Sequence, residues 1–237
     1  MTGARNAGKR STLMDLKNVY NGVATWFTRQ GQACWFCGGR CEHGVCDGCH
    51  QDLPRSVPLA VPRLSGVTVV DVPFSYCYPM DRLIQAFKFH KDPLARVAAT
   101  YLFSNNVSAH LPTNALGVAV PISLSRYLQR GFNQSLVLAQ GLAKARQLAL
   151  DEHLVRRVRG GLPQSQLASG LRRRNLDNAF RAVPRRAQAY QQVPVVIIDD
   201  VITTGTTVVQ VAAALKRCGV GEISVCALAA TMPRQVN

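Results

Sequence analysis

The segment from Val195 to Thr207 constrains the fold of this chain more than any other. It begins with four consecutive β-branched apolar residues, which are too few for a helix and are followed by the acidic pair Asp199 and Asp200. Such a run suits a strand that is buried on both faces of a parallel sheet. Because Val208 to Leu215 then has the apolar spacing of a helix, the segment predicts a strand–turn–helix unit of an α/β fold.

The turn of this unit predicts an anion site. It carries threonines on both sides of Gly205. Backbone N–H groups and hydroxyls at the positive end of a helix bind anions. An ordinary threonine-rich helix cap is the alternative interpretation. Asp199 and Asp200 favour the ligand site, because α/β sheets bind ligands at the carboxyl ends of their strands. A phosphate fits such a turn.

The charge of the chain indicates polyanionic partners. Its 237 residues include 28 Lys and Arg against 13 Asp and Glu, which gives a net charge of +15. The arginines favour bidentate contacts with phosphates or nucleic acid over simple electrostatic steering. The sequence has no run of 18 apolar residues, and its start lacks the apolar centre and cleavage site of a signal peptide. We therefore expect a cytoplasmic protein without membrane insertion.

The cysteines predict a structural zinc site. Five of the eight lie within 16 residues, and four of these form two Cys-x-x-Cys pairs separated by eight residues. Four thiolates at this spacing bind one Zn²⁺ tetrahedrally, and a redox or iron centre is the alternative. Three residues nearby in the sequence are alternative candidates for one ligand position, and a bystander role is favoured for each of them, namely Cys41, His43 and His50. The expected metal ligands are Cys34, Cys37, Cys46 and Cys49.

These patterns divide the chain into three regions. Residues 1–33 are expected to hold a tail and an amphipathic helix, residues 34–56 the zinc-binding minidomain, and residues 57–237 the α/β domain. Near the start of the α/β domain, Val67 to Val72 and Phe74 to Tyr78 are expected to form short strands that can pair as a hairpin.

Two further segments carry positive charge. Met80 to Phe89 has helical spacing, and this spacing alone makes Lys88 an ordinary solvated helix residue. Leu116 to Ile122 is expected to be a second buried strand. The segment from Arg126 to Ser135 that follows it carries two arginines and precedes a helix from Leu136 to Leu148. It is either a basic loop exposed to water or a mobile loop that grips an anion.

The central segment resembles the phosphoribosyl pyrophosphate (PRPP) signature of type I phosphoribosyltransferases. It fills every position of the pattern apolar-Asp-Asp-apolar-apolar-Thr-Thr-Gly-x-Thr. The resemblance implies that the acidic pair is catalytic and binds the ribose hydroxyls, and that the hydroxyl-rich loop holds the 5′-phosphate. The PRPP-binding residues that it implies are Asp199, Asp200, Val201, Thr203, Thr204, Gly205, Thr206 and Thr207.

Nearly the whole chain after its N-terminal region resembles the ComF family, which includes competence protein F and GntX-type proteins linked to DNA uptake and use. The resemblance is carried by Val-Pro at 120–121 with Arg126, by Arg-Gly-Phe-Asn-Gln at 130–134, and by Phe-Lys-Phe at 87–89 with Asp92. It implies a type I phosphoribosyltransferase-like parallel sheet flanked by helices. A small N-terminal zinc-binding minidomain is implied as well.

The first function that this resemblance implies is PRPP binding with Mg²⁺, in DNA uptake during natural transformation or in the use of external DNA. A divalent cation would bridge pyrophosphate and ribose oxygens and offset the charge of the leaving group. No residue pattern identifies a purine, pyrimidine or amine pocket, so the acceptor of a phosphoribosyltransferase reaction stays open. The candidates for pyrophosphate binding are Pro121, Ser123, Arg126, Arg130, Lys88 and Arg172.

The second function is that of a single-stranded DNA-binding competence factor without transferase turnover. The basic charge, the zinc knuckles and the aromatic pair Trp35 and Phe36 fit this function, because aromatic rings stack on bases. Alternatively, these two rings only cover the metal. The triple arginine from Arg172 to Arg174 follows a nucleic-acid backbone in this interpretation, and is a solvated helix face otherwise. Protein partners from a DNA-uptake machinery are a further expectation.

Overall fold

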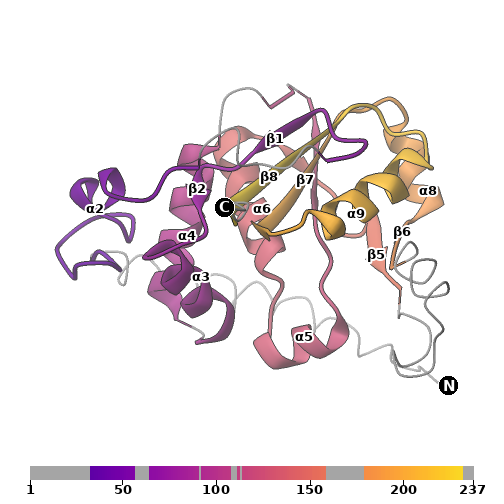
Figure 1. Cartoon of the computed structure of the whole chain (residues 1–237). Helices are drawn as coiled ribbons and strands as arrows, with labels where there is room; N and C mark the ends of the chain where they lie inside the picture. Colours follow the sequence, from indigo (N-terminus) through magenta and orange to yellow (C-terminus); the bar gives the residue numbers. More distant parts are fainter. Residues whose placement is uncertain are drawn as a thin grey trace, which may run out of the picture.

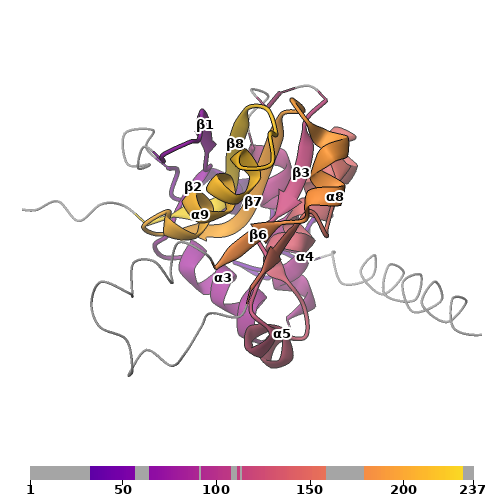
Figure 2. The same ribbon diagram turned by 90° about the vertical axis from the view of Figure 1, so that its right-hand side faces the viewer.

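A parallel β-sheet with helices on both faces forms the body of the protein (Figures 1 and 2). The structure is a computed structural model and describes residues 33–56, 64–90, 92–107, 111–112, 114–158 and 179–231. The parallel sheet and its two layers of helices confirm the predicted α/β fold. Apart from Ala33, the predicted tail and amphipathic helix of residues 1–33 lie outside the described residues, and so does Arg172.

The strands of the sheet follow the order β1-β8-β7-β3-β4, and β2 also pairs with β8. Every one of these pairings is parallel. The bounds are β1 Val69–Asp71, β2 Phe74–Ser75, β3 Leu116–Ala119, β4 Ala149–Leu150, β7 Val195–Ile202 and β8 Ile223–Ala230. A separate antiparallel pair consists of β5 Val155–Arg157 and β6 Phe180–Ala182.

Helices cover the sheet in two groups. The helices α3, α4 and α6 share one apolar core with the sheet, while α9, α8 and the β5–β6 pair share the other. Figure 2 shows α9, α8 and β6 in front of the sheet, with α3 and α4 behind it. The bounds are α2 Asp47–Gln51, α3 Met80–Phe89, α4 Pro93–Asn106, α5 Leu124–Arg130, α6 Gln134–Arg146, α8 Pro184–Ala187, the 3₁₀ helix η3 Gln188–Tyr190 and α9 Thr206–Lys216.

Strand β7 contributes to both apolar cores. Val196 and Ile198 pack with α3, α4 and α6, whereas Val195 and Ile197 pack with α9. All four side chains are 0% exposed. Alternate residues of a strand point to opposite faces, so a strand covered on both sides must be apolar at every position. The first charged side chains of β7 therefore appear only at its carboxyl end.

The predicted hairpin between residues 67 and 78 is wrong. Strands β1 and β2 both pair in parallel with β8, and their registers continue one another, with Val69 opposite Ser224 and Phe74 opposite Ala229. They are thus two parts of one edge strand, interrupted at Pro73. Proline lacks the N–H group that a continuous ladder needs, so the interruption at this position has a direct cause. The apolar runs predicted strands here, but they contained no information on direction.

The four-cysteine region packs along α4. At the start of this helix, the indole Nε1 of Trp35 donates a hydrogen bond to Asp92 Oδ2 at 2.9 Å, and the same aspartate caps α4. At its end, Arg55 Nη1 donates to Asn106 Oδ1 at 2.6 Å, and His50 Nε2 lies 2.9 Å from that oxygen. Two apolar residues of the region are buried in the core that contains α4, namely Val45 and Leu53. The division between residues 34–56 and 57–237 stays a prediction.

In the part of the chain that the structure describes, no helix has the length and apolar character needed to cross a bilayer.

Candidate functional site

The acidic pair lies at the carboxyl end of β7, at the edge where α6 and α9 begin. Ser135, in the first turn of α6, donates its hydroxyl to Asp199 Oδ1 at 2.9 Å. The backbone N–H of Asp200 donates to the same oxygen, also at 2.9 Å. Two donors therefore fix the orientation of the Asp199 carboxylate. Both carboxylates stand where parallel sheets bind ligands.

Asp200 is paired with a lysine from a distant part of the chain. The ammonium of Lys88, in the last turn of α3, lies 3.0 Å from Asp200 Oδ1. Only 17% of the lysine side chain and 12% of the aspartate side chain are exposed. The expectation that Lys88 is a solvated helix residue is therefore wrong. Helical spacing placed the residue outside the apolar stripe, but it could not reveal that α3 ends beside the strand that carries Asp200.

Burial and, after it, the charge of the neighbouring Asp200 carboxylate raise the pKa of Asp199 to about 7. The hydrogen bonds from the Ser135 hydroxyl and the Asp200 N–H, together with the charge of Lys88, oppose this shift. A second negative charge in the pair is thus costly in the absence of an additional cation. This electrostatic situation suits a site that takes up a divalent metal ion or a hydroxyl-rich ligand.

The threonine-rich turn lies between β7 and α9. Gly205 caps α9 with φ at +74°, a left-handed conformation that favours glycine. A Cβ atom at this position would also overlap the side chain of Leu64. Thr204 Oγ1 and Thr206 Oγ1 lie 2.9 Å apart, and Thr203, Thr204 and Thr206 are all exposed. The turn therefore presents hydroxyls to solvent at the N-terminus of an 11-residue helix.

The segment after β3 is helical where a loop was predicted. Ser123 caps α5, because its hydroxyl accepts the N–H of Arg126 at 3.3 Å, and Gly131 ends the helix with φ at +83°. Arg126 and Arg130 thus lie on a helix, and the predicted loop interpretations are both wrong for them. The cap and the glycine were visible in the sequence, but a helix of seven residues gives too weak a periodicity to be recognised.

Arg130 connects this helix to the acidic pair. Its Nη1 donates to Gln134 Oε1 at 2.9 Å, and its guanidinium lies 4.7 Å from the centre of the Phe89 ring. Burial lowers the pKa of Arg130, while the charge of Asp200 opposes this shift. Arg130 therefore stands within electrostatic reach of Asp200. Arg126 is exposed, and Pro121 and Ser123 lie between β3 and α5.

Two residues of this region were missed as site residues, namely Ser135 and Gln134. Ser135 orients Asp199, and the fully buried Gln134 supports Arg130. A usable signal existed for both, because they open the helix that follows the second buried strand. If β3 and β7 are neighbours, the connection that leads from β3 to α6 passes beside the carboxyl end of β7. That adjacency requires knowledge of the strand order.

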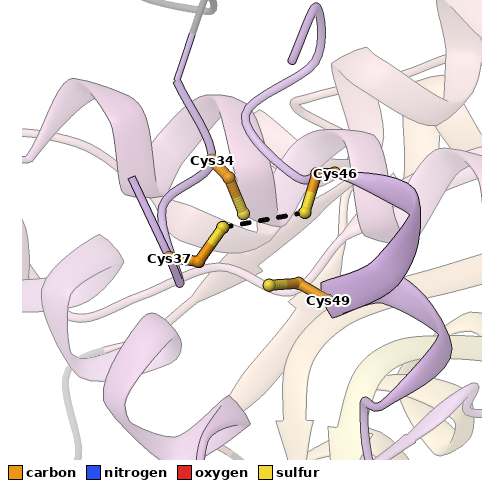
Figure 3. Close-up of side chains that lie close together, drawn as sticks. All are labelled: Cys34, Cys37, Cys46 and Cys49. Carbon is orange, nitrogen blue, oxygen red and sulfur yellow. Dashed lines mark hydrogen bonds between the residues drawn. The ribbon is translucent and has the colours of Figure 1, made fainter. Parts of the chain in front are cut away.

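The four predicted metal ligands converge (Figure 3). Their sulfur atoms all lie within 4.8 Å of one another, and those of Cys37 and Cys46 are 3.7 Å apart. Tetrahedral Zn–S bonds of about 2.3 Å separate the sulfurs by roughly 3.8 Å, so the geometry is compatible with zinc. The three nearby candidates stand outside this group of four. Of these, His43 stacks on Tyr101 and His50 contacts Asn106.

The electrostatics of the four thiols also fit a dication. Burial raises the pKa of Cys34, but backbone N–H groups of Cys46, Cys37 and Phe36 outweigh it and lower this pKa to about 6. For Cys49, burial and the neighbouring cysteines raise the pKa strongly. Four thiolates cannot all be charged at such short distances without a compensating cation. A Zn²⁺ ion bound by all four would supply this charge and stabilise the region.

Comparison with known proteins identifies the family. Residues 133–236 match the phosphoribosyl transferase domain family. A DNA utilization protein YhgH from Salmonella typhi is 35% identical over 190 residues, which cover 77% of this chain and 80% of the relative. The competence protein F of Haemophilus influenzae is 34% identical over 160 residues, which cover 65% of this chain and 69% of the relative.

The chain belongs to the ComF family. The predicted type I phosphoribosyltransferase-like fold is confirmed with this membership. Among solved structures, the chain is similar to glutamine phosphoribosylpyrophosphate amidotransferase from B. subtilis complexed with ADP and GMP. That similarity has a TM-score of 0.42 and 19% sequence identity, and it covers 60% of this chain and 30% of the other.

We expect the purified protein to contain one zinc ion per chain. Cys46→Ser should lose most of this metal, because it removes one of four convergent ligands. Its thermal unfolding midpoint should fall by roughly 5–10 °C, the shift expected for a loss of a few kcal/mol in a chain of this size. Elemental analysis and calorimetry measure the two effects. Cys77→Ser changes an exposed thiol outside the cluster and should alter neither; full zinc in Cys46→Ser would contradict the assignment.

The stability of the protein should depend on pH through Asp199. Its pKa is about 7 when folded and 3.8 in the reference state, so the folded chain binds more protons between these values. The stabilisation is complete below about pH 4 and is lost as the pH rises through about 7. Relative to Asp199→Asn, the wild type should lose up to about 4 kcal/mol over this range, given roughly 1.4 kcal/mol per pKa unit.

Urea denaturation at a series of pH values measures this difference. Glu152→Gln, which removes an exposed carboxylate, serves as the control and should follow the wild type. A constant difference between the wild type and Asp199→Asn across the range would show that Asp199 has an ordinary pKa.

Proposed function

We propose that this ComF-family protein binds PRPP together with Mg²⁺ at the carboxyl edge of β3 and β7, and that it acts in DNA uptake or in the use of external DNA. The observation that carries the proposal is the juxtaposition of two carboxylates with the hydroxyl-rich N-terminus of α9. One group suits sugar hydroxyls and a hard cation, and the other suits a phosphate. PRPP contains all of these partners in one molecule.

The proposed roles follow from the position of each group. Asp199 and Asp200 hold the ribose hydroxyls, with Mg²⁺ bound through water or directly. Residues 203–207 and the backbone at Val201 hold the 5′-phosphate, because the hydroxyls, the N–H groups at the start of α9 and the helix dipole attract an anion there. When bound, the metal ion would offset the negative charge of the pyrophosphate leaving group. The two carboxylates would serve as its protein ligands.

The pyrophosphate is proposed to lie toward α5. Ser123, Arg126 and Arg130 lie on or just before this helix, Pro121 lies beside them, and Lys88 approaches from α3. The arginines supply bidentate donors for phosphate oxygens. Transfer would join ribose C1 to an acceptor nucleophile and release pyrophosphate. Arg172 remains a pyrophosphate candidate by resemblance alone, since it lies outside the described residues.

The proposed cellular role rests on the relatives, which are called DNA utilization protein and competence protein F. In such a role, protein partners from a DNA-uptake machinery are expected. A PRPP-dependent step would link the handling of incoming DNA to nucleotide metabolism, because PRPP is the phosphoribosyl donor for nucleotides.

Asp200→Asn should weaken PRPP binding by at least about tenfold, since it removes one carboxylate from the proposed ribose and metal contacts and a charge-assisted contact contributes roughly 1.5–3 kcal/mol. Titration calorimetry with PRPP and excess Mg²⁺ measures the effect. Glu152→Gln also removes one carboxylate, but from an exposed position that contacts Gln140, and it should bind as the wild type does. Absence of PRPP binding by the wild type at millimolar concentration would refute the proposal.

A second function, single-stranded DNA binding without turnover, is favoured by a cluster of arginines. On the β5–β6 pair, Arg156 stands directly opposite Arg181, and Arg157 lies 5.2 Å from the centre of the Phe180 ring. Burial and the charge of Arg126 lower the pKa of Arg157, so α5 continues this cluster. Like charges in directly opposed positions destabilise a strand pair, and a polyanion would relieve this repulsion.

The aromatic pair Trp35 and Phe36 of the four-cysteine region gives less support to DNA binding. Trp35 donates its indole N–H to Asp92, and both Trp35 and Phe36 pack against the core of the protein. An exposed aromatic side chain for base stacking is present instead on α5, where Tyr127 is 49% exposed.

Binding of a fluorescent single-stranded oligonucleotide should weaken steeply with salt. For Arg156→Gln/Arg181→Gln, the slope of log K against log salt should become shallower by about 1.4, which corresponds to two lost phosphate contacts. Lys144→Gln/Arg217→Gln removes two exposed charges from other positions and should leave the slope unchanged. An affinity that does not respond to ionic strength would exclude DNA binding through this cluster.

A further inference from the structure

The ion pair between Lys88 and Asp200 assigns Lys88 a role that the sequence did not reveal. We propose that Lys88 is the resident counter-cation of the acidic pair, which keeps free divalent metal ions from Asp200 and releases this carboxylate when PRPP arrives with its metal. Lys88 is thus a positioning residue for ligand binding. This inference deepens the proposed function and rests on it.

The first observation is that the pair is short and shielded from water. The Lys88 ammonium lies 3.0 Å from Asp200 Oδ1, and both side chains are less than one fifth exposed. Water screens charges weakly at such a site, so the lysine and a metal ion at the same oxygen repel each other strongly. A divalent ion that binds Asp200 directly must therefore displace the ammonium.

The second observation is how firmly the last turn of α3 is held. Phe87 is buried, and its ring lies 5.7 Å from that of Phe132. Phe89 lies under the guanidinium of Arg130 at 4.7 Å. Phe132 and Arg130 both belong to the connection between β3 and α6. The residues on both sides of Lys88 thus anchor its backbone beside the proposed pyrophosphate region, so the lysine is placed between Asp200 and that region.

The chemistry of lysine suits an exchange of partners. Its ammonium sits on a flexible four-carbon stem with three donors, and a change of rotamer can move it from a carboxylate to a phosphate oxygen. Free Mg²⁺ offers Lys88 no new anion when it displaces the ammonium. A metal–PRPP complex offers pyrophosphate oxygens at the same moment. The arrangement therefore favours the complex over the free ion.

The test measures metal binding without PRPP. Mn²⁺ replaces Mg²⁺ as the probe, and electron paramagnetic resonance gives the concentration of free ion. Lys88→Met should bind Mn²⁺ at least about tenfold more tightly than the wild type, since it removes a full positive charge at contact distance from Asp200. Lys88→Arg keeps a cation and should stay within about twofold of the wild type.

A matched control distinguishes an effect at the acidic pair from the general effect of removing one positive charge. Lys144→Met removes one exposed lysine from α6 and should bind Mn²⁺ as the wild type does. Lys88→Gln is measured alongside Lys88→Met, because it retains a donor to Asp200 and keeps the test valid if the methionine variant does not fold. It should show the same gain in Mn²⁺ affinity. With saturating Mg²⁺ present, Lys88→Met should bind PRPP at least about tenfold more weakly, because a charge-assisted contact to phosphate is lost.

The two proposals can fail separately. If Lys88→Met and Lys88→Gln bind Mn²⁺ alone no more tightly than the wild type, the counter-cation role is overturned, whether or not PRPP binds. If they gain Mn²⁺ affinity while PRPP binds to none of the proteins, the counter-cation role stands and the proposed PRPP function falls. A gain of Mn²⁺ affinity with a loss of PRPP affinity supports both.

Discussion

The burial of β7 on both faces is the constraint on which the rest of this structure depends. Its four apolar residues from Val195 to Ile198 have no contact with water, and each backbone N–H and C=O group along them must find a partner in β3 or β8. Polar side chains can enter only where the two helix layers stop covering the strand. The carboxyl end is such a place, and Asp199 and Asp200 stand there. The position of the candidate site is therefore a result of how the core is built.

Local patterns in the sequence were sufficient for part of this architecture. The apolar run of β7, its acidic end and the glycine turn are all contained in one short segment, so strand, site and helix could be predicted together. The Cys-x-x-Cys pairs were equally local, and the four sulfurs converge as expected. In both cases the decisive residues are close in sequence, and their geometry depends little on the rest of the fold.

The remaining features depend on contacts between distant segments. Lys88 and Asp200 are 112 positions apart in the sequence, and Ser135 and Asp199 are 64 positions apart. Neither contact can be derived from periodicity, because periodicity describes one element and not which elements are neighbours. The parallel direction of β1 and β2 was missed for the same reason. Helix α5 was missed for a different one, since seven residues carry little periodic information.

The two hydrogen-bonded anchors of the four-cysteine region have a mechanical consequence. Asp92 and Asn106 mark opposite ends of α4, about 21 Å apart at 1.5 Å per residue, and the region is attached at both. A body fixed at one point can swing, whereas a body fixed at two distant points cannot pivot about either. The region therefore follows α4 along its length, and the burial of Val45 and Leu53 in the core that contains this helix opposes rotation about the line that joins the two anchors.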